Sequence, residues 1–175
     1  INEEELFTKD YAYLSSVSQT WLNHCESFVH KIVDELNLSS KSLVLEVAAN
    51  DGYLLQYFKN KNIPCIGVEP TEYAANIAKG KGLEILNEFF TLKNATKFIK
   101  RFRKVDLVIG NNVYAHVPDI KDFTLALKEI INKNGVISLE FPHLMKLIEK
   151  KQFDTIYHEH FSYLSFTSVN NIFND

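Results

Sequence analysis

Four adjacent side chains near the end of the chain, Tyr157-His158-Glu159-His160, can each give or take a proton or a hydrogen bond. If this segment is extended, the two histidines share one face, and Tyr157 and Glu159 share the other. Three interpretations are open on the residues alone. The histidines could bind a metal with further ligands, although no H-E-x-x-H spacing is present. The segment could be a solvated edge strand, or one histidine could be a general base oriented by the acid, because histidine titrates near neutral pH.

A second group of candidates begins at Glu46, in the run EVAANDG that follows an apolar segment. A dinucleotide site prefers G-x-G-x-x-G, because a pyrophosphate must approach the backbone closely, and this run has one glycine. S-adenosylmethionine carries an amino-acid group in place of a phosphate, and a carboxylate here can pair with its ammonium, directly or through water. Small residues such as Ala48 would let the backbone approach. Alternatively, Asn50 to Gly52 only make a tight turn.

Glu69-Pro70 ends the next apolar segment, about 20 residues after the first loop. A carboxylate at this position suits a ribose diol, which offers two hydroxyl donors to one acid. Enzymes that use nicotinamide cofactors have the same device, so Glu69 indicates an adenosine ribose without selecting the cofactor. A solvated acid at the end of a strand is the alternative.

The third candidate loop is Asn87-Glu88-Phe89-Phe90. Its aromatic rings could pack on an adenine, although two adjacent phenylalanines are more often part of a core. Asn87 precedes these rings at the end of a short apolar segment. We therefore include Asn87, Phe89 and Phe90 among the candidate cofactor-binding residues.

The fourth candidate loop is NNVYAHVPD, which follows the apolar segment VDLVIG. Asn111 and Asn112 would lie over the ligand site, and a histidine on a loop, here His116, is a better functional candidate than one within a helical stripe. Asp119 could instead be a helix N-cap and nothing more.

The elements that must position these loops alternate between strand and helix. A first long helix has an apolar stripe formed by Leu22, Cys25, Val29, Ile32, Val33 and Leu36. Strands are predicted at 42–48, 64–70, 83–86, 105–110 and 134–141, and helices at 53–61, 71–82, 91–102 and 119–132. This alternation predicts an α/β fold, a Rossmann-like, doubly wound and mostly parallel sheet. Ligands bind such sheets beyond the carboxyl ends of the strands, where all four loops lie.

Composition sets the class of protein. With 175 residues, 46% hydrophobic and 23% charged, the chain is long enough for one globular domain. The net charge of -3 gives no reason to expect nucleic acid or a membrane surface as a partner, and no apolar run approaches a membrane span. Two lone cysteines, Cys25 and Cys65, suit a reducing cytoplasm and are too few for a cysteine-only zinc site.

The motifs together resemble those of the nucleotide-sugar C-methyltransferases, which act on deoxyhexoses. The resemblance runs through nearly the whole chain and rests on DYAYLSSVSQTWLNH, EVAANDGYLL, GVEP, NNVYAHVPD, LEFPHL and FDTIYHEHFSYLSF. It implies the class I methyltransferase fold, S-adenosylmethionine as cofactor, and methylation of a 4-keto nucleotide sugar at the carbon next to the ketone. No metal is implied in this part of the protein.

The resemblance also implies roles for individual residues. His160 matches the proposed base that removes the sugar proton, while Tyr157, Glu159 and His116 fall in the sugar site. Tyr11, in the DYAY segment, would close over the site from the N-terminal side. Residues 1–40 are expected to form a helical segment that leads into a cofactor-binding domain at 41–175. Relatives add an N-terminal zinc-binding domain and a C-terminal domain, so we expect that the chain is part of a longer protein, with zinc only in that further domain.

Other functions compete with this interpretation. An O- or N-methyltransferase would use the same cofactor loops and need less help from a base. A nicotinamide-dependent sugar oxidoreductase would share the ribose acid, but the scarcity of glycine in the first loop argues against it. A non-catalytic module would keep the fold without turnover, and the filled YHEH cluster argues against that for the parent protein.

Overall fold

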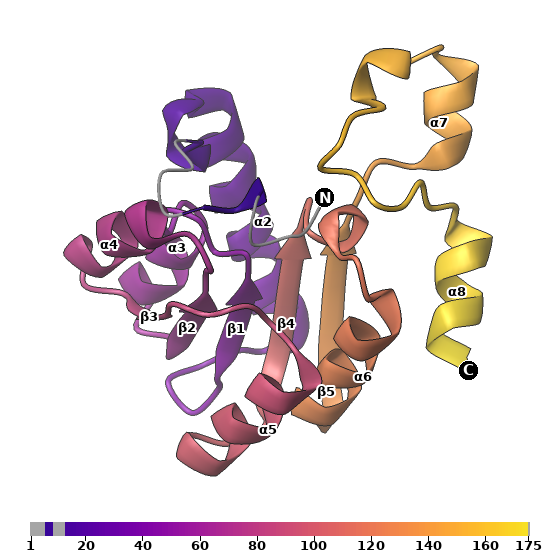
Figure 1. The fold of residues 1–175 in the computed structure, drawn as a ribbon. Helices are drawn as coiled ribbons and strands as arrows, with labels where there is room; N and C mark the ends of the chain where they lie inside the picture. The colour runs from indigo at the N-terminus through magenta and orange to yellow at the C-terminus, as the bar shows by residue number, and fades with distance from the viewer. Residues whose placement is uncertain (1–5, 9–12, 175) are drawn as a thin grey trace.

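One parallel sheet of five strands lies at the centre of the computed structural model, which describes residues 6–8 and 13–174 (Figure 1). The strand order is β3-β2-β1-β4-β5, and every pairing is parallel. The strands are β1 (Val44–Val47), β2 (Cys65–Val68), β3 (Glu84–Leu86), β4 (Val105–Asn111) and β5 (Ile131–Glu140). The order reverses between β1 and β4, which is where such a sheet opens a crevice at its carboxyl edge. The predicted Rossmann-like α/β fold is confirmed.

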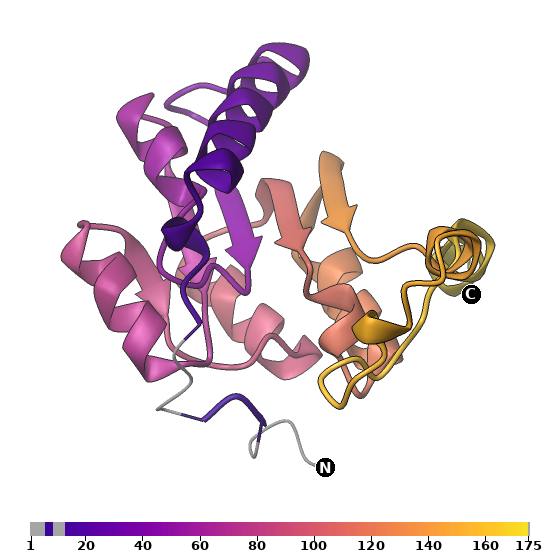
Figure 2. The ribbon, with the colours of Figure 1, turned by 90° about the horizontal axis from the view of Figure 1, so that it is seen from above.

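Helices cover both faces of the sheet. The helices of the described chain are α2 (Gln19–Leu36), α3 (Leu55–Asn60), α4 (Glu72–Gly80), α5 (Leu92–Arg101), α6 (Ile120–Ile130), α7 (Leu144–Glu149) and α8 (Phe166–Asn174). Helices α2, α3 and α4 pack on one face and α5 and α6 on the other, whereas α7 lies beyond the edge of the sheet (Figure 1). Seen from above, α2 and α6 lie on opposite sides of the sheet (Figure 2). Alternate residues of β1 separate the two cores: Leu45 and Val47 pack with α5 and α6, whereas Val44 packs with α2 and α3. Glu46 therefore points into the core beneath α2 and α3.

The stripe of helix α2 is buried as its spacing predicts. Cys25 and Val29 are fully buried, and the other members of the stripe pack partly buried against the same core. Ser18 caps the first turn by accepting the backbone N–H of Trp21 at 3.3 Å. Asn37 ends the helix in the left-handed conformation, with φ of 51°. This helix is long enough to run from the carboxyl edge of the sheet along the core face.

The boundary between α6 and β5 differs from the prediction. Helix α6 ends at Ile130 and β5 begins at Ile131, so the helix ends before the predicted residue 132 and the strand begins before the predicted residue 134. Ile131 pairs with Val105 and Val136 with Leu107, which places a bulge between the two contacts. The polar residues 132–134 lie in this irregular part of the strand.

After β5 the chain leaves the sheet, and we call residues 144–165 the excursion. It contains α7 and a short 3-10 helix at Phe153–Thr155, and it projects beyond the sheet edge before α8 returns beside α6 (Figure 1). The backbone N–H of Leu144 donates to the carbonyl of Leu164 at 2.8 Å and closes the base of the excursion. No helix in the described part of the chain is long and apolar enough to cross a membrane.

Candidate active site

A cavity of about 940 Å³ opens along the carboxyl edge of the sheet. It brings together residues that lie far apart in the sequence, from both groups of candidates. The predicted site residues in its wall are Ala48, Asn50, Glu69, Pro70, Phe89, Phe90, Asn111, Asn112, His116, Tyr157, Glu159 and His160. Of the remaining predicted residues, Glu46, Gly52 and Asn87 lie outside the wall, and Tyr11 lies outside the described residues.

Three residues of the first loop adopt the left-handed backbone conformation. Ala48, Asn50 and Gly52 have φ values of 58°, 48° and 76°, a conformation that glycine adopts most readily. Gly52 is also required by packing, because a Cβ atom there would lie 2.3 Å from Leu83 Cδ1. The loop thus has the backbone path of a glycine-rich turn although only one of the three positions is glycine. Backbone conformation, which residue counting could not reveal, lets this edge approach a ligand.

Glu46 lies beneath the cavity wall and not in it. The side chain is fully buried, and neither carboxylate oxygen has a hydrogen-bond partner among the described residues. Burial raises its pKa well above the usual value; nearby Tyr53 opposes the rise, while the carboxylates of Glu69 and Asp51 add to it. Tyr53 does line the cavity and was missed by sequence reasoning. Direct pairing of Glu46 with a ligand ammonium is thus not provided by this geometry, and contact through water stays a prediction.

Three hydrogen bonds fix the carboxylate of Glu69, which directly follows β2. Its Oε2 accepts the backbone N–H of Asn50 at 2.9 Å, and its Oε1 accepts the backbone N–H and hydroxyl of Thr71 at 2.8 and 2.5 Å. Burial raises the pKa of Glu69, and these three bonds oppose that rise. Because each carboxylate oxygen accepts about two bonds, Oε2 keeps capacity for a ligand hydroxyl. Glu69 is 4% exposed and lines the cavity.

Asn87 is a support for this second loop and not part of the cavity wall. Its Nδ2 donates to the backbone carbonyls of Glu69 and Pro70, at 2.8 and 2.9 Å. The contact predicted between Asn87 and the cofactor stays a prediction. The amide fixes the backbone of the acid that does face the cavity, a role that the residue type allows equally well.

The third and fourth loops supply aromatic and amide groups. Phe90 is buried and packs edge-on against Phe123 with ring centroids 5.1 Å apart, yet it also lines the cavity, as does Phe89. The core and adenine interpretations are thus compatible. Asn112 has φ of 52°, and its backbone N–H donates to the carbonyl of Glu140 at 2.8 Å, which ties the end of β4 to β5.

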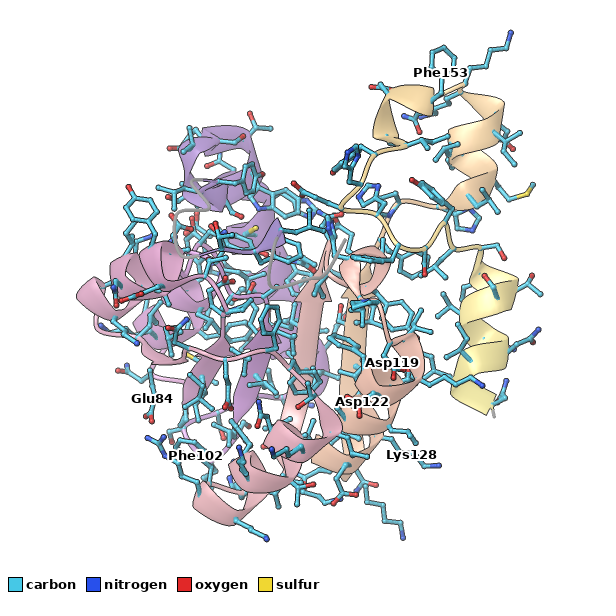
Figure 3. The ribbon with its side chains drawn as sticks, in the orientation of Figure 1. Glu84, Phe102, Asp119, Asp122, Lys128 and Phe153 are labelled. Atoms are coloured by element: carbon cyan, nitrogen blue, oxygen red, sulfur yellow. The ribbon has the colours of Figure 1, made fainter. Side chains whose placement is uncertain are left out.

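Asp119 is the N-cap of α6, the structural role that the sequence left open for it. Its Oδ1 accepts the backbone N–H of Asp122 at 3.0 Å at the start of α6. Asp122 in turn accepts the backbone N–H of Leu92 at 3.0 Å, which joins the starts of α5 and α6. Both acids, labelled in Figure 3, lie at the start of α6 and line the cavity.

The YHEH cluster forms a turn, so the extended arrangement is wrong. The backbone N–H of His160 donates to the carbonyl of Tyr157 at 3.1 Å, and the two rings lie 4.4 Å apart. Turning the chain brings Tyr157, Glu159 and His160 into the cavity wall and leaves His158 exposed outside it. The turn is fastened to the loop after β4, since the backbone N–H groups of residues 161 and 162 donate to the carbonyl of Ala115.

The imidazole of His160 is fixed in one tautomer. Its Nδ1 lies 2.8 Å from the carbonyl oxygen of Thr155, which can only accept, so Nδ1 carries the proton. In this tautomer Nε2 carries the lone pair, the requirement for a general base. A backbone carbonyl in the 3-10 helix thus orients the ring, and the orienting role suggested for Glu159 stays a prediction.

His116 faces His160 with ring centroids 4.7 Å apart. The pKa of His116 is lowered to about 4, chiefly by burial and also by the neighbouring His160, while a hydrogen bond with the Glu159 backbone opposes the shift. His116 is thus neutral at pH 7. Its Nδ1 is buried and has no hydrogen-bond partner among the described residues.

The N-terminal residues contribute the remaining wall. Phe7, Tyr13, Ser18 and Trp21 line the cavity, and Phe7 lies edge-on to His116 at 5.9 Å. Tyr11 cannot be placed, because it lies outside the described residues. Within the described ranges, no three histidine, cysteine or acidic side chains are grouped as metal ligands.

The sheet order and the ligand edge define a fold class, the Rossmann-like α/β domain, which is also the fold of S-adenosylmethionine-dependent methyltransferases. A protein of that description from Archaeoglobus fulgidus superposes with a TM-score of 0.69 at 16% identity, over 87% of this chain and 67% of that chain. The PH0226 protein of Pyrococcus horikoshii superposes with a TM-score of 0.70 at 13% identity, over 99% of this chain and 89% of that one. These likenesses establish the fold.

Sequence comparison assigns the family. Residues 20–175 match the family model of the methyltransferase domain, and the chain belongs to that family. The C-methyltransferase NovU of Streptomyces niveus is 30% identical over 171 residues, which cover 98% of this chain and 41% of that relative. The chain thus spans less than half the length of this curated relative. The predicted methyltransferase identity is confirmed, while the sugar substrate stays a prediction.

Proposed function

We propose that the parent protein is an S-adenosylmethionine-dependent C-methyltransferase that methylates a nucleotide-activated 4-keto deoxysugar at the carbon next to the ketone. One observation carries the proposal. A single cavity has a carboxylate with spare acceptor capacity, Glu69, in one part of its wall and a histidine with a free Nε2 lone pair, His160, in another. A carbon acid needs such a base, whereas an oxygen or amine acceptor needs less help.

The cavity wall fits the cofactor. Oε2 of Glu69 suits the ribose hydroxyls, the rings of Phe89 and Phe90 suit the adenine, and the loop containing Ala48 suits the amino-acid end. When bound, S-adenosylmethionine supplies an electrophilic methyl group. Asn111, at the end of β4, lies in the wall next to this loop and completes the cofactor part of the cavity.

The other part of the cavity can generate the nucleophile. In the proposed reaction Nε2 of His160 removes the proton next to the ketone, and Nδ1–H continues to donate to the Thr155 carbonyl, which stabilises the cation formed. Burial and the Glu159 carboxylate raise the pKa of Tyr157, so its hydroxyl stays a hydrogen-bond donor at pH 7. Tyr157 and neutral His116 are therefore suited to bind the enolate oxygen. Holding both reactants in line supplies much of the acceleration.

The charge of the wall indicates which part of the acceptor enters. No lysine or arginine is among the described residues of the wall, whereas Glu159, Asp119 and Asp122 are. An uncharged sugar ring is compatible with these groups, but a diphosphate would be repelled. We therefore place the diphosphate and nucleotide outside this cavity, in agreement with an acceptor held partly by another region of a longer protein.

The test uses the full-length protein. Calorimetry is expected to detect binding of S-adenosylhomocysteine and none of NAD. A 4-keto nucleotide sugar incubated in D₂O with S-adenosylhomocysteine is expected to exchange the proton next to its ketone, because abstraction does not require methyl transfer. Methylation of an oxygen or nitrogen, located by product mass and position, would overturn the C-methyltransferase assignment, and binding of NAD alone would overturn the cofactor.

A further inference from the structure

The side chain of Asn50 is occupied by the N-terminal part of the chain. We call residues 13–18 the entry segment, because they precede α2 and form part of the cavity wall. Asn50 Oδ1 accepts the backbone N–H of Ser15 at 2.8 Å, and Asn50 Nδ2 donates to the carbonyl of Tyr13 at 3.0 Å. The amide thus bonds to the backbone of the entry segment at two points, as a neighbouring strand would.

The adjacent acid strengthens the same connection. The hydroxyl of Ser16 donates to Asp51 Oδ2, and Lys81 Nζ donates to the Asp51 carbonyl at 2.7 Å and lies 3.4 Å from Oδ2. Asp51 is fully buried, so these bonds are shielded from water. Three residues of the entry segment, Tyr13, Ser15 and Ser16, are therefore bonded to the first loop over a sequence separation of 35 to 37 residues.

The backbone of Asn50 is engaged on the opposite side. Its N–H donates to Oε2 of Glu69, the oxygen proposed to bind the ribose. One residue thus links the entry segment to the cofactor carboxylate, with its side chain on the former and its backbone on the latter. Asparagine also tolerates the required φ of 48°, which explains why it can hold both positions.

We propose that Asn50 is a positioning residue that fastens the entry segment over the bound adenosyl cofactor, and that its amide is not itself a ligand of the cofactor. The inference rests on the proposed function, since it needs a ligand at Glu69. Because the two sites share Asn50, a bound cofactor and an ordered entry segment stabilise each other, and loosening the segment accelerates cofactor release.

Asn50→Gly removes the amide while the backbone keeps its left-handed conformation. The matched control is Asn62→Gly, the same exchange at φ of 56° on an exposed turn before β2. In the full-length protein, Asn50→Gly is expected to raise the Kd for S-adenosylhomocysteine about three- to tenfold, mainly through faster dissociation. Asn62→Gly is expected to leave the Kd unchanged.

A second pair of variants removes the bond from the other side. Ser15→Pro deletes the N–H that Asn50 accepts, and Leu14, at φ -118° and ψ 122°, already has the conformation preferred before proline. Ser15→Ala removes the hydroxyl but keeps that N–H. The difference in affinity between Ser15→Pro and Ser15→Ala therefore gives the contribution of the N–H. Adding Ser15→Pro to Asn50→Gly is expected to cause no further loss of affinity, because both changes remove the same contact.

Hydrogen exchange of peptides covering residues 13–18 is the second measurement. Asn50→Gly is expected to accelerate exchange there both with and without S-adenosylhomocysteine. Wild-type affinity in Asn50→Gly would overturn the positioning role of Asn50. Additive losses in the double variant would also overturn it and would indicate instead that the Asn50 amide contacts the ligand directly. If the wild type fails to bind S-adenosylhomocysteine, the proposed function fails. Unchanged hydrogen exchange of residues 13–18 in ligand-free Asn50→Gly would by itself refute the positioning role of Asn50.

Discussion

The cavity has two proposed parts, a cofactor part around Glu69 and an acceptor part around His160, and they are built in different ways. The cofactor part consists of loops that directly follow β1, β2, β3 and β4, so the sheet itself sets their positions. The acceptor part depends on the turn around His160, which belongs to the excursion and follows β5 by about 20 residues. Two backbone bonds to Ala115 hold that turn in place. The fold therefore determines where a cofactor can bind, and a local addition to the fold determines what is done with it.

The two parts also respond oppositely to pH. Burial favours the neutral form on both sides, which raises the pKa of Glu69 and lowers the pKa of His116. The raised carboxyl pKa contributes stability at low pH that is lost as pH rises through it. The lowered histidine pKa contributes stability above about 6.5 that is lost as pH falls toward about 4. A substitution that affects only one part can therefore be recognised by whether it changes stability at low pH or at high pH.

Replacing the proposed base should have the largest effect and should be confined to the acceptor part. His160→Asn in the full-length enzyme is expected to lower kcat by roughly 10²- to 10⁴-fold, because general-base catalysis contributes on that scale. The Kd for S-adenosylhomocysteine is expected to stay at the wild-type value. Steady-state kinetics and calorimetry measure the two quantities. Substantial turnover in the variant would remove His160 from the base role, and a parallel loss of cofactor affinity would show that the two parts are not separable.

Gly52→Ala tests the packing beneath the cofactor part. The new Cβ would meet Leu83 Cδ1 at 2.3 Å and Ala78 Cβ at 3.2 Å, at a φ of 76°. We expect a loss of about 2–4 kcal/mol in the free energy of unfolding, measured by urea denaturation. Gly80→Ala is the control, because a Cβ at Gly80 meets nothing within 4 Å at the end of α4. It should be neutral or slightly stabilising, and a similar loss in both variants would contradict the packing argument.

His116→Asn tests the pH response of the acceptor part. In the unfolded chain His116 titrates near 6.5, whereas in the folded chain its pKa is about 4, so between these values only the unfolded state gains the proton. Wild-type stability is expected to fall by about 1–3 kcal/mol more than that of the variant between pH 7.5 and pH 4.5. Denaturation at both pH values measures this difference. Parallel losses in the two proteins would mean that His116 is not held neutral by its surroundings.

The cofactor part was largely predictable because its signals are local. Apolar segments followed by Glu46, by Glu69 or by Asn111 identified the strand ends, and parallel topology brought those ends to one edge. Which face each side chain occupies was not predictable at the same level. Glu46 lies on the core side of β1, and Asn87 turns toward the backbone of the loop after β2, because strand alternation and hydrogen-bond competition decide such details.

The acceptor part was predictable by residue type and not by geometry. The cluster at 157–160 attracted attention through its composition, but an extended segment would have separated Tyr157 from His160, and the turn brings them together. The group that orients His160 is the carbonyl of Thr155, and backbone carbonyls carry no sequence signal. Tyr53 was missed for a related reason, since an aromatic residue after a glycine turn looks like ordinary core.

The smallest predicted effect concerns Ala48, which holds a left-handed conformation without being glycine. Ala48→Gly relieves steric cost at φ of 58° but adds chain entropy to the unfolded state, so we expect stabilisation of less than about 1 kcal/mol. Ala49→Gly is the neighbouring control. Ala49 is fully buried, is not among the positive-φ residues and closely approaches Gly67, so losing its methyl group should destabilise by about 1–2 kcal/mol.

If the free energy of unfolding rises in Ala48→Gly and falls in Ala49→Gly, the conformation of the backbone, and not the number of glycines, makes the first loop suited to a cofactor. The same urea titrations, with S-adenosylhomocysteine affinity measured in parallel, provide both readouts. We expect Ala48→Gly to keep wild-type affinity, because glycine adopts the φ that alanine already holds. A marked loss of affinity without a loss of stability would instead mean that the Ala48 methyl group contacts the ligand. The cofactor part would then depend on side chains as the acceptor part does.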